Sequence, residues 1–186
     1  MSVVTTLSKL IVKKFCINPL IVAPIITLVF ILTACSPKFD WREVRGTESP
    51  FTVLLPAKPA TFSRELTLNS VPLKMQMTAA DVDGISFAVG SAKVTDASKI
   101  PGVLDAMQQG MLNNIHGIPE KASNQISGQS ASDVVAHGKL ANGQPVKFVG
   151  RFLTRGMWVY QIVIIGKEKA LTPEVVDTFM TSFKIN

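Results

Sequence analysis

The chain has 186 residues, with 19 Lys and Arg against 13 Asp and Glu, and a length that favours one domain plus an N-terminal segment. Residues 1–34 hold three lysines and no acidic residue, so the rest of the chain carries a net charge of only +3. This mild, scattered charge excludes the clustered basic surface that nucleic acids require, and we predict no nucleic-acid partner.

The N-terminus has the pattern of a secretory signal peptide. Its three lysines precede an uncharged stretch, residues 16–37, whose apolar centre spans residues 20–32. A basic region, an apolar region and small residues before a cleavage site make up this signal. We therefore predict that residues 1–34 are removed on export.

The sequence Leu32-Thr33-Ala34-Cys35 resembles the lipobox of bacterial lipoproteins, with an aliphatic residue and two small residues before a cysteine. The resemblance implies that Cys35 receives a diacylglyceryl thioether, that type II signal peptidase cleaves before it, and that the new amine is acylated. Two or more acyl chains hold a protein stably on a membrane. Cys35 is therefore the predicted lipid-attachment site, and the membrane is the predicted partner.

Two alternatives stay open for this segment: an uncleaved transmembrane helix, because the uncharged stretch could nearly span a bilayer, and an ordinary secretory signal. Pro19 and Pro24 weaken a regular helix here. All three readings keep the lysines cytoplasmic and export the rest of the chain to the periplasm. By the enterobacterial sorting rule, Ser36 favours the outer membrane over the inner membrane.

The two cysteines leave no thiol chemistry to the mature domain. Cys16 lies in the segment to be removed, and the sulfur of Cys35 is consumed by lipid. We predict a domain without a disulfide or a thiolate metal ligand, held together by its core.

The first half of the mature chain has the pattern of β-strands. We predict a lipidated cysteine and tether over residues 35–50, with a strand start at 41–44, and a globular domain over residues 51–186. Alternating apolar residues predict four strands, at 51–56, 62–68, 73–79 and 85–89. Asp83-Gly84 predicts a hairpin turn before the last of them.

The second half combines two helices with further strands. Helical spacing runs from Pro101 to Ile115, Gly117 is suited to end that helix, and residues 121–132 are predicted as a loop. Three strands are predicted, at 134–140, 146–152 and 157–165, the last apolar on both faces and hence central. Thr172 and Pro173 begin a closing helix that reaches Phe183.

These elements predict a single α+β domain, an antiparallel sheet with two packed helices. Four features resemble the PsbP-like α/β/α sandwich: Phe-Thr-Val-Leu-Leu-Pro at 51–56, hairpins before a single helix, the long hairpin ending in 157–165, and Phe-Met-Thr-Ser-Phe-Lys at 179–184. Photosystem accessory proteins, a Ran-binding nuclear import factor and many small bacterial lipoproteins share this fold. The resemblance covers residues 40–186, implies a non-enzymatic accessory or binding role, and transfers no functional residue.

Reactive side chains form no catalytic pattern. His116 and His137 have no His or Cys at metal-ligand spacing. Asp81 and Asp83-Gly84 lack the distal glutamate of a calcium loop, since a strand follows, and no Gly-x-Ser-x-Gly occurs. We predict no enzyme activity, no cofactor and no metal; a hydrolase or metal-dependent enzyme using His116 or His137 is the least favoured hypothesis.

The best surface feature is a set of basic residues, Lys139, Lys147, Arg151 and Arg155. They are interpreted either as a solvated sheet face that discourages edge aggregation, or as a patch for anionic lipid, lipopolysaccharide or an acidic partner. In the second case Lys147, Arg151 and Arg155 form the candidate surface for an envelope protein partner.

The remaining hypothesis depends on a group of methionines. Four of them, Met75, Met77, Met107 and Met111, belong to one predicted strand and the first predicted helix. They are interpreted either as core filling or as the lining of a site for an apolar ligand. The leading prediction is thus a lipid-anchored periplasmic accessory or binding protein without enzymatic activity, and the alternative is a carrier of an apolar ligand or lipid.

Overall fold

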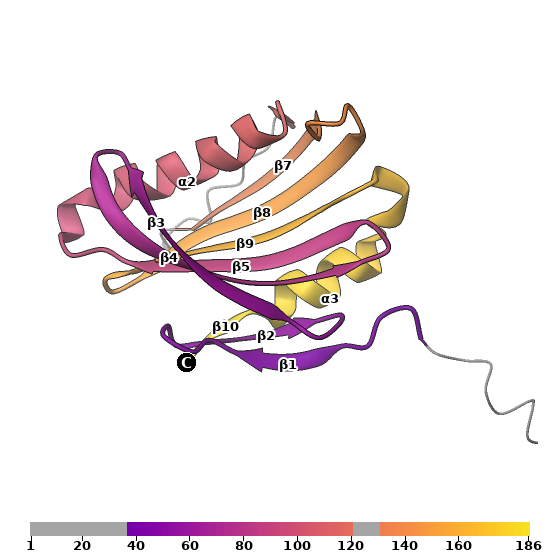
Figure 1. The fold of residues 1–186 in the computed structure, drawn as a ribbon, viewed down its shortest axis with the longest axis horizontal. Coiled ribbons are helices and arrows are strands. Elements are labelled where there is room, and N and C mark those ends of the chain that lie inside the picture. Colours follow the sequence, from indigo (N-terminus) through magenta and orange to yellow (C-terminus); the bar gives the residue numbers. More distant parts are fainter. Residues whose placement is uncertain (1–36, 121–130) are drawn as a thin grey trace, which may run out of the picture. The chain divides into compact units, whose positions relative to one another are not determined.

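The computed structural model describes residues 37–120 and 131–186, so the predicted signal peptide and Cys35 lie outside the described residues. Within the described part of the chain, seven antiparallel strands form the larger sheet, in the order β3-β4-β5-β9-β8-β7-β6 (Figure 1). Their bounds are β3 Ala60–Leu68, β4 Val71–Val82, β5 Ile85–Lys93, β6 Ile118–Pro119, β7 Ala131–Lys139, β8 Pro145–Arg155 and β9 Trp158–Gly166. β9 is the middle strand and is mostly buried on both faces, which confirms the predicted central strand.

A smaller sheet consists of β1 (Arg42–Arg45), β2 (Phe51–Leu55) and β10 (Lys184–Ile185), with β2 in the middle. Alternate residues of β2, namely Phe51, Val53 and Leu55, are almost fully buried. This second sheet was not predicted, because β10 has two residues and is too short to show a period.

The two helices lie on opposite faces of the larger sheet (Figure 1). Helix α2 (Ile100–Asn114) packs in one apolar core, and helix α3 (Pro173–Ser182) packs in the other together with the smaller sheet. Short 3-10 helices, η1 (Ala97–Lys99) and η2 (Glu168–Ala170), precede α2 and α3. The protein is therefore a single α+β domain with two packed helices, as predicted.

The start of α3 lies where the sequence predicted it, whereas the end of α2 differs from the predicted one. The hydroxyl of Thr172 accepts a hydrogen bond from the backbone of Val175, as expected of an N-cap residue. At the end of α2 the left-handed conformation falls on His116, with a φ of 47°, and not on Gly117. The amide of Gly117 then donates to the carbonyl of Leu112 at 2.8 Å, which closes the last turn.

The folded unit begins at Lys38, so the domain boundary predicted at residue 51 is too late. β1 pairs with β2 along its whole length. Trp41 packs edge-on against Phe87, with ring centroids 5.7 Å apart, and Phe39 contacts the same ring. Residues 38–50 thus belong to the domain rather than to a tether, because their aromatic side chains complete the core beside α3.

The hairpin turns show where local sequence is informative. Asp83 and Gly84 have φ values of 50° and 75° between Val82 and Ile85, which confirms the predicted turn. The turn between β3 and β4 uses Asn69 and Ser70, again with positive φ, and was missed because no glycine marks it. Of the loop predicted over 121–132, residues 121–130 lie outside the described residues, and residues 131–132 belong to β7.

Candidate functional site

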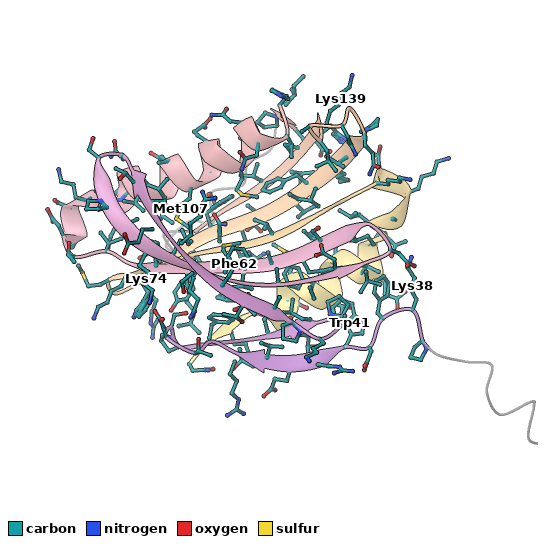
Figure 2. The ribbon with its side chains drawn as sticks, viewed as in Figure 1. Lys38, Trp41, Phe62, Lys74, Met107 and Lys139 are labelled. Atoms are coloured by element: carbon teal, nitrogen blue, oxygen red, sulfur yellow. The ribbon has the colours of Figure 1, made fainter. Side chains whose placement is uncertain are left out.

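An apolar groove lies between α2 and the edge hairpin formed by β3 and β4. Its cavity volume is about 240 Å³. It is lined by residues of four elements, Phe62, Arg64, Leu66, Leu68, Met75, Met77, Ala106, Met107, Gly110, Met111, Asn114 and Gln161. Figure 2 labels two of them, Phe62 on β3 and Met107 on α2. A concave, mostly apolar surface with a few polar groups is the general form of a small-molecule site.

Strand register explains how distant residues meet in this groove. Phe62 pairs with Met77, Met77 with Gly90, and Gly90 with Gln161, so one row crosses four strands. A Cβ atom on Gly90 would lie 2.7 Å from Cγ of Gln161 and 2.7 Å from Sδ of Met77. The glycine therefore leaves room for the Gln161 side chain to lie along the sheet surface beneath α2.

Gln161 is the buried polar group of the groove. Only 6% of the surface of this residue is exposed to solvent. Nε2 lies 3.7 Å from Sδ of Met77 and 4.0 Å from Sδ of Met111. Thioether sulfur is a weak acceptor, so the amide retains most of its hydrogen-bonding capacity. In the sequence Gln161 is visible as the polar interruption of an apolar strand, which was the signal available for finding it.

All four methionines that the sequence singled out line the groove. Met75 and Met107 are also buried in the core beside α2, at 4% and 3% exposure. The structure therefore brings these residues together, and they serve both as core and as groove lining. Phe62 and Arg64 were missed by sequence reasoning, because an edge strand with little burial has no period that identifies its inner face.

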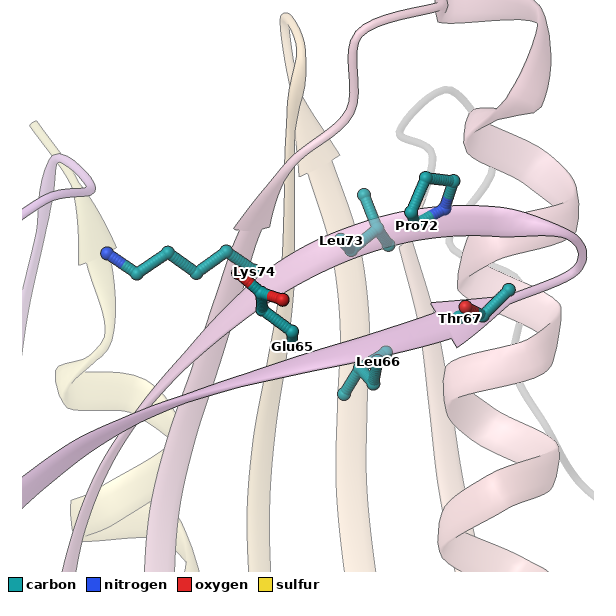
Figure 3. A pocket seen from close by; sticks show the side chains of 6 residues that line it. All are labelled: Glu65, Leu66, Thr67, Pro72, Leu73 and Lys74. Carbon is teal, nitrogen blue, oxygen red and sulfur yellow. The ribbon is translucent and has the colours of Figure 1, made fainter.

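Two other hollows lie on the described domain. A depression of about 450 Å³ is lined by Glu65–Thr67 and Pro72–Lys74 (Figure 3). Its lining comes from one hairpin alone, so it assembles no groups from distant elements. A hollow of about 310 Å³ lies beside the first residues of the folded unit and is lined in part by Lys38, Trp41 and Lys169.

The predicted basic surface is a line of residues rather than a cluster. Lys147, Arg151 and Arg155 point to one face of β8, as the alternation predicts. However, Lys147 and Arg155 are eight positions apart, which corresponds to about 27 Å along a strand. Lys139 lies near Lys147, at the β7–β8 end (Figure 2). The fold therefore places Lys147 and Arg155 at separate ends.

Arg151, midway between them, has an internal role. Its Nε and Nη2 donate to the two carboxylate oxygens of Asp133 on β7, both at 2.7 Å. Nη1 lies 3.4 Å from the carbonyl oxygen of Met180, in the last turn of α3. The hydrogen bonds to Asp133 raise the pKa of the Arg151 guanidinium above its ordinary value. A cation beside the last carbonyls of a helix is also favourable for the helix dipole.

Replacing Arg151 by alanine is expected to lower the free energy of unfolding by about 1–2 kcal/mol, because the half-buried Asp133 and a helix-end carbonyl lose their donor. The exposed Arg155 is the matched control on the same strand, and Arg155→Ala is expected to change stability by less than about 0.5 kcal/mol. Urea unfolding measures both. Equal effects of the two variants would contradict the structural role of Arg151.

The histidines are not brought into a common site. His137 Nε2 lies 2.7 Å from Oε1 of Glu120 at an exposed position. His116 is exposed at the end of α2. The carboxylates of the Asp83-Gly84 turn have partners of their own, because Ser86 donates to Asp81, and Lys38 lies 3.5 Å from Asp83. Among residues 37–120 and 131–186, no three His, Cys, Asp or Glu side chains gather closely enough to hold a metal ion.

The fold and the groove define a class of protein: a single α+β domain that presents an apolar hollow between a helix and an edge hairpin. Among the described residues, no helix combines the length and the hydrophobicity that a membrane-spanning segment requires. No protein-family model matches this chain, and no curated protein matches its sequence.

Proposed function

We propose that this protein is a lipid-anchored accessory or binding protein of the bacterial envelope, facing the periplasm and without enzymatic activity. The observation that carries the binding role is the apolar groove beside α2, with Phe62 52% exposed at its rim. An exposed aromatic side chain next to an apolar hollow is a feature of recognition surfaces. The proposed PsbP-like relationship is consistent with a sandwich of helices and sheet.

The proposed anchor is Cys35, and the folded unit begins three residues later at Lys38. Three residues of extended chain span roughly 10 Å. An acylated Cys35 would thus keep the domain next to its membrane, which Ser36 favours as the outer one. A binding domain on so short a tether is suited to partners at or near the bilayer surface.

A second candidate function is that of a carrier of an apolar ligand or lipid in the envelope. The observation that favours it is the gathering of four methionines in one groove. Methionine is flexible and polarizable, so it adapts to apolar ligands of varied shape. The two candidates differ in their occupant, a protein in the first case and a small amphiphile in the second.

Photo-crosslinking in intact cells tests the accessory role. With p-benzoylphenylalanine in place of Phe62, we expect a discrete adduct with an envelope protein. The same probe at Lys58, an exposed position in the turn after β2, is the control and is expected to give none. Identical products from both positions, or none from either, would count against a protein partner at the groove.

A further inference from the structure

We propose that the groove between α2 and the β3–β4 hairpin binds a single-chain amphiphile with an anionic head group, held by Arg64 and Gln161. This inference rests on the second proposed function, the carrier, and names its ligand class. It depends on four features of the groove: its size, a glycine in its helical wall, a buried amide, and a cation that has no ion-pair partner among the described residues.

The size and lining of the groove suit one acyl chain. A volume of about 240 Å³ is that of about eight water molecules at about 30 Å³ each. Aliphatic and methionine side chains from β3, β4 and α2 supply the walls. A hollow of this size accommodates part of one acyl chain.

Gly110 keeps the helical wall open. It lies inside α2, where glycine destabilises a helix relative to alanine. No atom lies within 4 Å of the position that a Cβ atom would occupy, so packing in the described structure does not require a glycine there. Together with Ala106 one turn earlier, it leaves a shallow stretch of helix facing β3, and a larger side chain would enter the groove.

Two polar groups give the groove a preference for anions. Gln161 is buried, and the hydrogen-bond partners of its Nε2 within the described residues are the thioether sulfurs of Met77 and Met111. Because these are weak acceptors, the N–H groups can turn to a stronger one. Arg64 is the charged residue among those that line the groove, and it makes no ion pair within the described residues. Glu65 points to the opposite face of β3, because side chains alternate along a strand.

The test is protection of a cysteine placed in the groove of the full chain, which is held in lipid nanodiscs if it is extracted from the membrane and kept in buffer if it is not. Gly110→Cys is labelled with an aqueous maleimide, and modification of the peptide that contains residue 110 is followed by mass spectrometry. Dodecanoate at about ten times its Kd is expected to slow labelling about tenfold, because only the free groove reacts. Gln109→Cys, exposed on the adjacent helical position, is the control and is expected to keep its rate.

Two further amphiphiles define the head group. Dodecyltrimethylammonium has a comparable chain with a cationic head and is expected to give no protection, and Arg64→Glu is expected to abolish protection by dodecanoate. Lauroyl lysophosphatidylglycerol carries an anionic phosphate. If it slows labelling at residue 110, the ligand class includes lipids with an anionic head group. If dodecanoate alone slows labelling, the ligand is a free fatty acid. Either result supports the proposal.

Three outcomes would overturn the inference: unchanged labelling of Gly110→Cys with both anionic amphiphiles, equal protection at residues 109 and 110, or equal protection by cationic and anionic heads. Ala106→Cys, with the exposed Asp105→Cys as its control, repeats the test if Gly110→Cys does not fold. The readout is local to α2 and does not require an acylated Cys35. Failure of the groove and failure of the lipid anchor are therefore distinguishable.

Discussion

Replacing Cys35 by alanine is expected to abolish lipid attachment and to release the protein from stable membrane association. The physical reason is that each buried acyl methylene contributes about 0.8 kcal/mol, so two or more chains together hold a protein stably on a membrane. Without the sulfur, no thioether forms and cleavage before residue 35 is lost. Membrane fractionation with intact-mass analysis measures the result: the unaltered chain should start at Cys35 and carry diacylglyceryl and acyl mass.

Cys16→Ala is the matched control, since this cysteine lies within the predicted signal peptide and its loss should leave the mature mass unchanged. A Cys35→Ala chain that is still processed, sized and retained like the original would contradict the lipoprotein assignment. An uncleaved chain held by residues 16–37 would instead support the transmembrane alternative.

Phe179→Ala is expected to lower the free energy of unfolding by about 3–5 kcal/mol, the usual cost of removing a fully buried aromatic side chain. Phe179 is 0% exposed and meets Phe87 edge-on, with ring centroids 5.3 Å apart. Its loss would open a cavity where α3 packs on the larger sheet. Urea unfolding followed by the fluorescence of Trp41 and Trp158 measures the change.

Asp177→Ala is a suitable control on the same helix, because Asp177 is exposed and its side chain faces water. This variant is expected to shift stability by less than about 0.5 kcal/mol. If Phe179→Ala were as stable as Asp177→Ala, the closing segment Phe179–Lys184 would have a role other than packing, and its resemblance to a shared structural motif would lose its physical basis.

Local pattern was sufficient for the long elements. The alternation in β4, the continuous apolar run of β9, the helical spacing in α2 and the Asp83-Gly84 turn each contain their own local signal, so element type and approximate bounds were predicted correctly. Element ends were less predictable. His116 takes the left-handed position because α2 ends at Asn114 with Ile115 as its C-cap, so His116 and not Gly117 is the first residue after the cap. Residues 38–50 join the domain through aromatic contacts with Phe87, which lies far along the chain.

The functional residues, too, were predictable where they follow a local pattern and unpredictable where they depend on strand pairing. The sequence alone identified the four methionines and the basic face of β8, because both follow from spacing along single elements. It did not identify Arg64 or Phe62, because the face of β3 on which they lie is defined only once β3 pairs with β4. Nor did it reveal that Arg151 is engaged by Asp133, since that pair depends on the register of β7 against β8.

By itself, the amino-acid sequence determined the two described helices, the long strands and the fold class, since these depend on residues that are close in the chain. Tertiary structure decided which side chains share a surface, because strand order brings together residues as distant as Phe62 and Gln161. It also decided which charges remain available to a ligand: Arg151 is neutralised by a neighbouring strand, whereas Arg64 at the sheet edge has no such neighbour among the described residues.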